Sequence, residues 1–212
     1  MPSIQLRAMD YRLASKIYDR EPQDIVVTKA MSVDGAVGAI RAKVGSNKIA
    51  RLTLLCHGYN EILEGNTLPG YSASIAHPGT PSQSSVEPAT FSRVYGGYGL
   101  EWGSDDVSLE TVPAFGRLNG TFADGGIIVV FGCAAAGTGP AITQRLGGDG
   151  PALMRAIARF AGAPVRASDA LQDVFIDTFN NAADRRAWAG RTFLFMPDGG
   201  QVDESKLPMS VY

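Results

Sequence analysis

The sequence predicts an α/β protein with a mainly parallel sheet, and three observations support this class. A strand, a helix and a second strand follow one another within residues 24–56, and such a βαβ unit makes its two strands parallel. Residues 127–131 are all apolar, which indicates a strand buried on both faces. The composition, 45% hydrophobic and 19% charged over 212 residues, is typical of one globular domain spanning residues 1–212.

The elements of the N-terminal half are predicted in chain order. In residues 1–22 charged side chains interrupt the apolar ones, so we expect an N-terminal arm or edge element. Residues 24–29 are rich in β-branched side chains and predict a strand. Ser32 is expected to cap a helix that extends to Val44, and residues 51–56 predict the second strand.

The rest of the chain is less regular at first. Residues 59–106, rich in Pro, Ser and Gly, predict a long loop or hairpin insertion, with residues 98–102 as a short strand or hairpin arm. An amphipathic helix is expected over residues 107–118. After the strand at 127–131, we expect a capping role for Asp149 and a helix from Pro151 that ends at Gly162. Further predictions are a strand at 164–168, a partly helical stretch at 171–188, and a last strand and turn at 191–200.

Composition and charge exclude several classes of function. The net charge of -2 does not favour nucleic acid or an acidic membrane surface as a partner. No apolar run is long enough for a membrane span, and no secretory signal fits the N-terminus, so we expect a cytoplasmic protein, with non-classical export left open. Two cysteines and two histidines without short spacings do not predict a metal site, and no cofactor is expected because P-loop and dinucleotide motifs are absent.

Two predicted strands end in side chains that carry chemistry. The first runs into His57 and Gly58, and the second into Gly132 and Cys133. If these strands are neighbours in a parallel sheet, both side chains emerge at its carboxyl edge, where ligands bind in such sheets. A histidine beside a thiol favours the reactive thiolate, and the backbone N–H groups of Gly58 and Cys133 are candidate oxyanion donors.

The same pattern resembles the caspase-like (clan CD) cysteine peptidases. Residues 34–169 are more closely similar to an uncharacterised bacterial caspase-like family found at the front of very large secreted or adhesin-like proteins. The matching pieces are residues 54–58, 99–103, 127–137 and 162–169. The chain departs from this family at Ala134, where Asp is usual, and in residues 137–150, which look like an insertion.

The resemblance implies a three-layer αβα sandwich and a Cys–His dyad, with Cys133 as nucleophile and His57 as base or acid. The expected activity is that of a cysteine endopeptidase acting on a protein or peptide substrate. The resemblance also implies that the strand after the cysteine lines the substrate pocket, so Ser168 and Asp169 are candidate substrate-binding residues. Asp169 would select a basic substrate residue and Arg166 an acidic one, and we favour Asp169.

Other interpretations stay open at this point. A cysteine at a strand end is commonly a buried apolar residue, which is the role we expect for Cys56, and a disulfide between Cys56 and Cys133 is a further alternative. The whole domain is alternatively an inactive relative that binds a partner protein. A third hypothesis is an effector-type cysteine deamidase, because glutamine amides and peptide bonds require similar chemistry.

Overall fold

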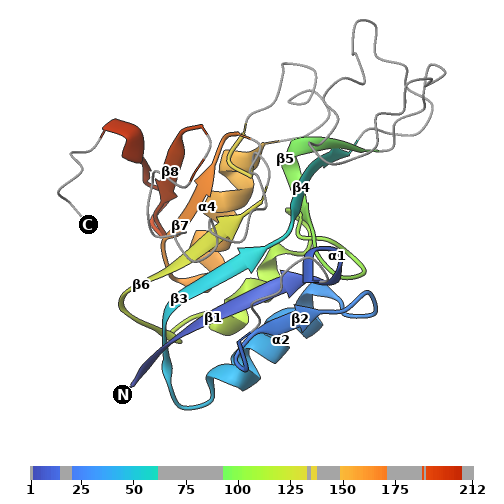
Figure 1. Ribbon diagram of the computed structural model, residues 1–212. Coiled ribbons are helices and arrows are strands. Elements are labelled where there is room, and N and C mark those ends of the chain that lie inside the picture. The colour runs from blue at the N-terminus through green and yellow to red at the C-terminus, as the bar shows by residue number, and fades with distance from the viewer. Residues whose placement is uncertain are drawn as a thin grey trace, which may run out of the picture.

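The structure is a computed structural model that describes residues 2–14, 21–61, 93–132, 135–137, 149–170, 188 and 190–206. These residues form a seven-stranded sheet in the order β2-β1-β3-β6-β7-β8-β9 and a separate two-stranded sheet of β4 and β5 (Figure 1). The neighbouring strands from β2 to β7 are parallel, whereas β8 is antiparallel to both β7 and β9. The predicted α/β class with a mainly parallel sheet is therefore confirmed.

The strands of the large sheet are β1 (Ser3–Asp10), β2 (Ile25–Val27), β3 (Lys48–Leu55), β6 (Phe122–Phe131), β7 (Val165–Ser168), β8 (Thr192–Phe195) and β9 (Gln201–Asp203). The small sheet consists of β4 (His57–Glu61) and β5 (Arg93–Glu101). The helices are α1 (Tyr11–Ala14), α2 (Val33–Val44) and α4 (Gly150–Ala161), with short 3-10 helices η1 (Val112–Leu118) and η3 (Glu204–Lys206).

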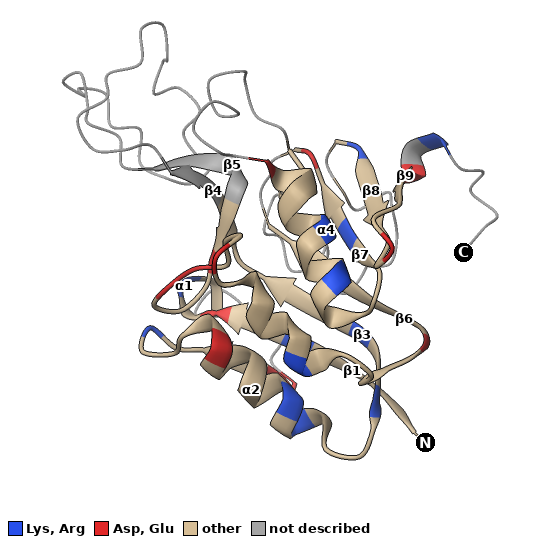
Figure 2. Cartoon of the chain, turned by 180° about the vertical axis from the view of Figure 1, so that it is seen from behind, with Lys and Arg blue, Asp and Glu red and all other residues tan. Residues whose placement is uncertain are grey.

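The large sheet separates two hydrophobic clusters. α2, η1 and α4 share one cluster with one side of the sheet, and Figure 2 shows α2 and α4 together on that face. Leu13 of α1 and Trp188 pack with Met9, Leu55 and Phe131 in a smaller cluster. Successive strand residues point to opposite faces of a sheet, so Leu54 belongs to the first cluster and Leu55 to the second. This arrangement is compatible with an αβα sandwich.

Both longer helices begin and end as the sequence predicts. The Ser32 hydroxyl accepts a hydrogen bond of 3.0 Å from the backbone N–H of Gly35, which caps α2. In α4 the carboxylate of Asp149 accepts one of 2.9 Å from Ala152, and Gly162 ends the helix in the left-handed conformation at φ 67°. The capping roles predicted for Ser32, Asp149 and Gly162 are therefore confirmed.

The prediction of an N-terminal arm or edge element is wrong. β1 lies between β2 and β3, with Ala8 beside Ile25 on one side and Leu54 on the other. Its charged residue Arg7 does not prevent this position, because it lies on the more polar face and pairs with Asp24. The strands of the predicted βαβ unit, β2 and β3, are accordingly parallel but separated by β1.

Three further predictions are corrected in detail. The helix expected over residues 107–118 is the shorter η1, because Val107 is instead bridged to Leu100 and Pro113 lies at the start of the turn. β6 begins five residues earlier than the apolar run, at Phe122. β9 follows the last predicted turn and was not expected from its short polar sequence. The helical stretch expected within residues 171–187 lies outside the described residues.

Part of the region predicted as a long loop or hairpin insertion is a β-hairpin. β4 pairs antiparallel with β5, so that His57 lies opposite Glu101 and Glu61 lies opposite Arg93. The hairpin continues directly from the carboxyl end of β3 and extends away from the large sheet (Figure 1). The expectation that residues 98–102 contribute a strand or hairpin arm is confirmed over residues 98–101.

Candidate active site at the carboxyl ends of the strands

The strands that carry the two predicted dyad positions are neighbours. β3 and β6 are parallel, and Leu55 at the end of one is paired with Phe131 at the end of the other. The backbone N–H of Cys56 then donates a hydrogen bond of 3.4 Å to the carbonyl of Phe131. Counted along the chain, His57 and Cys133 each come two residues after this last pair. The structure thus brings the two strand ends together at one edge of the sheet.

Cys133 and Ala134 themselves lie outside the described residues, whereas the chain on both sides of them is described. Gly132 is buried beside the end of β3. The backbone N–H of Ala136 donates a hydrogen bond of 2.9 Å to the carbonyl of Ser168 at the end of β7. Gly150, the first residue of α4, donates one of 3.1 Å to Gly137. The described residues on the two sides are therefore fixed: Gly132 continues β6, and residues 135–137 are hydrogen-bonded to β7 and α4.

Gly132 allows close packing at this edge. A Cβ atom at this position would lie 3.3 Å from the carbonyl oxygen of Cys56 and 3.4 Å from a methyl group of Leu100. Cys56 is only 3% exposed and belongs to the main hydrophobic cluster, which confirms its predicted role in core packing. The side chains of Cys56 and Leu100 thus fill the helix-covered side of the strand ends.

His57 and Gly58 begin the hairpin above this edge. His57 is half-buried and is paired directly with Glu101, while the buried Gly58 is paired with Leu100. Neighbouring residues of a strand point to opposite faces, and side chains directly across an antiparallel pair share a face. The His57 and Glu101 side chains therefore lie together on the face of the hairpin opposite to Leu100.

Three charged residues that the sequence did not predict as part of a site meet at the base of the hairpin. Asp10, at the end of β1, is fully buried and accepts hydrogen bonds from the backbone N–H of Gly103 at 2.9 Å and of Arg12 at 2.9 Å. The Arg12 guanidinium donates to both Asp10 oxygens at 3.0 Å, and its Nε lies 3.4 Å from an oxygen of Glu101. A charged chain Asp10–Arg12–Glu101 thus leads to His57.

This chain holds Arg12 firmly in its charged form. Burial by itself lowers the pKa of Arg12, but the carboxylates of Asp10 and Glu101 overcome this effect, and the net result is a raised pKa. An acidic residue at the end of a β-strand is the signal that could have identified Asp10. The prediction of an arm over residues 1–22 places no strand end at Asp10 and therefore does not identify it.

Glycine at position 103 fixes the segment that follows Glu101. Gly103 has φ +71°, and a Cβ atom there would collide with the carbonyl oxygen of Met31. The next residue, Ser104, donates a backbone hydrogen bond of 2.8 Å to the same carbonyl. The end of β5 is therefore anchored both to Asp10 and to the residues that precede α2.

The predicted substrate-binding residues have partners within the chain. Ser168 is fully buried, and its hydroxyl accepts a hydrogen bond of 3.2 Å from Ala170. Asp169 accepts hydrogen bonds of 2.8 Å from the backbone N–H and from Nε of Arg191, whose guanidinium is largely exposed. Gly190 permits this contact, because a Cβ atom there would lie 2.8 Å from the Asp169 carboxylate. The Asp169 carboxylate is therefore already paired with Arg191 within the chain.

Arg166, the alternative specificity residue, is also paired. Its guanidinium donates two hydrogen bonds of 2.8 Å to the carboxylate of Glu204, and both side chains are buried. Such a two-pronged pair satisfies the charge of both groups within the fold. Arg166 therefore joins β7 to η3, and its positive charge is already neutralised by Glu204.

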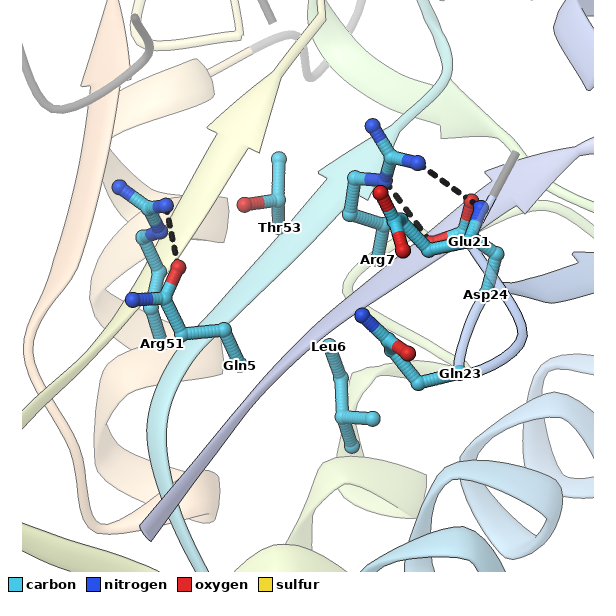
Figure 3. Close-up of a pocket in the computed structure, with 8 residues that line it drawn as sticks. All are labelled: Gln5, Leu6, Arg7, Glu21, Gln23, Asp24, Arg51 and Thr53. Atoms are coloured by element: carbon cyan, nitrogen blue, oxygen red, sulfur yellow. Dashed lines mark hydrogen bonds and ion pairs between the residues drawn. The ribbon is translucent and has the colours of Figure 1, made fainter. Parts of the chain in front are cut away.

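A pocket of about 270 Å³ lies away from His57, on the sheet face that α2 and α4 do not cover (Figure 3). Arg7 at its rim donates hydrogen bonds of 2.8 and 2.6 Å to Asp24, and Arg51 is hydrogen-bonded to Gln5. Burial and the neighbouring Arg166 cation lower the pKa of Arg51. The remaining lining residues are Leu6, Glu21, Gln23 and Thr53. Its ion pair and hydrogen bonds are internal, so the pocket does not by itself indicate a ligand.

Within the described residues, no helix is long and apolar enough to cross a membrane, and no cluster of three potential metal-ligating side chains is found. Comparison with known proteins identifies no matching family model, no similar curated protein and no similar solved structure.

Proposed function

We propose that the protein is a cysteine endopeptidase of the caspase-like type, with Cys133 as nucleophile and His57 as its acid–base partner. The observation that carries this proposal is the parallel pairing of β3 and β6 up to Leu55 and Phe131. Two candidate catalytic positions that are 76 residues apart in the sequence follow directly from that pair. The carboxyl edge of a parallel sheet is also where such folds bind their ligands.

Peptide hydrolysis would use the Cys133 thiol and the His57 imidazole in successive steps. The Cys133 thiol transfers its proton to His57, and the resulting thiolate forms an S–C bond with the carbonyl carbon of a peptide. The backbone N–H groups of Gly58 and Cys133 would stabilise the oxyanion. The C–N bond then breaks as protonated His57 gives its proton to the leaving amine, and a water molecule, deprotonated by His57, hydrolyses the thioester.

Thiol reactivity tests the dyad directly. An ordinary thiol with a pKa near 8.5 is only about 3% thiolate at pH 7, whereas a thiol paired with imidazolium is mostly thiolate. We therefore expect iodoacetamide to label Cys133 selectively at pH 6–7 and much faster than the buried Cys56. His57→Ala should slow this labelling by about tenfold or more, because it removes the proton acceptor. His77 is the other of the two histidines in the sequence, so His77→Ala is the matched control and should leave the rate unchanged.

Peptide cleavage completes this test. A library of short peptides should be cleaved by the unmodified protein but not by Cys133→Ala, with products separated by mass spectrometry. Ordinary slow labelling of Cys133 that is insensitive to His57→Ala would contradict the proposal and favour the protein-binding alternative. Conversion of glutamine to glutamate without backbone cleavage, a mass increase of about one dalton, would overturn the peptidase in favour of the deamidase.

A further inference from the structure

The hairpin places one acidic side chain next to the proposed acid–base residue. His57 and Glu101 are directly paired across the antiparallel strands β4 and β5. The Cβ atoms of such partners are about 4.5–5.5 Å apart, and their side chains lie on the same face. Both side chains are long enough for the carboxylate to reach the imidazole, directly or through one water molecule.

Ion pairs with Arg12 and, through it, Asp10 hold the Glu101 side chain in position. The Glu101 side chain is only 16% exposed, and its carboxylate lies 3.4 Å from the guanidinium of Arg12. Arg12 is in turn bound to Asp10, which has no exposed surface and also accepts from the backbone N–H of Gly103, two residues after Glu101. The side chain and the backbone of this part of β5 are therefore both tied to the end of β1.

From this arrangement we propose that Glu101 is a positioning residue for His57, an inference that rests on the proposed function. Its carboxylate accepts one imidazole N–H, fixes the tautomer and ring orientation, and stabilises the imidazolium formed when the thiol loses its proton. Carboxylates that accept from one ring nitrogen have this effect on the other.

The charges around His57 determine whether replacement of Glu101 stabilises or destabilises the imidazolium form of His57. Glu101 is the carboxylate across the hairpin, while Arg12 from α1 is a cation held between Glu101 and Asp10. The Arg12 guanidinium lies over the ring of Tyr11, 4.6 Å from the ring centroid. Replacing Glu101 by neutral Gln removes the nearest stabilising charge and leaves the Arg12 cation. The imidazolium form of His57 should then become less stable.

Titration of the histidine side chains by NMR tests this inference without any need for activity. The chain contains only two histidines, so His77→Ala assigns the signals of His57. Glu101→Gln should lower the pKa of His57 by about half a unit or more. Glu110→Gln replaces an exposed glutamate on the segment after β5 and is the matched control, for which we expect no shift.

The labelling rate provides the second measurement. In Glu101→Gln the pH profile of Cys133 alkylation should shift in parallel with the His57 titration, with a rate about three- to tenfold lower at pH 7. An unchanged His57 pKa in a folded Glu101→Gln protein would overturn the role of Glu101, even if Cys133 is reactive. Normal coupling of His57 to Glu101 with an unreactive Cys133 would instead overturn the peptidase proposal, so the two failures are distinguishable.

Discussion

At the scale of single residues, two side chains considered for substrate recognition, Arg166 and Asp169, form ion pairs within the chain. Arg166 is bound to Glu204, and Asp169 is bound to Arg191. These two pairs differ in their surroundings, because the first is buried and the Arg191 side chain of the second is 63% exposed. A pair in water contributes little to stability, whereas removal of one partner from a buried pair leaves an uncompensated charge. The first pair is therefore the one expected to matter for folding.

Glu204→Gln should lower the free energy of unfolding by about 3 kcal/mol or more, because it leaves Arg166 buried without its countercharge. Urea denaturation followed by circular dichroism measures this change. Exposed Glu110→Gln serves as a control and should change stability by less than about 0.5 kcal/mol.

Replacing both partners of the buried pair distinguishes charge from packing. Arg166→Met combined with Glu204→Leu should recover much of the stability lost in the single variant, since apolar residues of similar volume can replace a buried ion pair. A single Glu204→Gln variant as stable as the unmodified protein would show that the pair is not desolvated as described.

The residues of the candidate site were predictable only where a reactive side chain stands at the end of a predicted strand. His57 and Cys133 each come at the end of a largely apolar segment that predicts a strand, so local sequence was sufficient to select them. Asp10, Arg12 and Glu101 meet only because β1 lies beside β3 and β5 folds back on β4. That proximity depends on strand order and register, which local periodicity does not determine.

At the scale of elements, the same distinction separates successful predictions from wrong ones. The helices α2 and α4 have their own capping residues, and β6 contains a run of apolar residues, so each is specified locally. The arm predicted over residues 1–22 is wrong because its charged and apolar residues alternate. Ile4, Leu6 and Ala8 lie on one face of β1 and Gln5 and Arg7 on the more polar face, which is the period of two typical of a strand.

Substitutions on the two faces of β1 test its position in the sheet. Ala8 has no exposed surface, so Ala8→Asp should destabilise the protein by about 3 kcal/mol or more through burial of a charge. Gln5→Asp, on the exposed face of the same strand, should cost less than about 1 kcal/mol. Thermal unfolding of both variants provides the comparison, and equal stabilities would instead support the N-terminal arm that the sequence first suggested.

At the scale of the whole molecule, the β4–β5 hairpin forms a two-stranded sheet separate from the large sheet, and its two strands pair with each other. Glu61 and Arg93 are paired at the far end of β4 and β5. The chain therefore leaves β4 and returns to β5 at two directly opposed residues. The contacts that attach the hairpin to the domain are at its other end, around Glu101 and Gly103. The two ends of the hairpin therefore have separate structural roles.

Replacement of residues 62–92 by a short Gly-Asn-Gly turn tests this separation. We expect the shortened protein to fold with a melting temperature within a few degrees of the original, because the closure of a shorter loop costs less entropy and no described contact is removed. The His57 NMR titration should also be preserved. Loss of folding in the shortened protein would show that residues 62–92 are required by the sheet.

The lengths of the outer strands have a consequence for self-association. β2 and β9, the two edges of the large sheet, have three residues each, whereas the longest strands of that sheet, β1, β3 and β6, lie inside it. An edge this short offers few unpaired backbone groups to a strand from another molecule. Growth of the sheet from one copy to the next is thereby discouraged, and concentrated samples should resist fibril formation by this route.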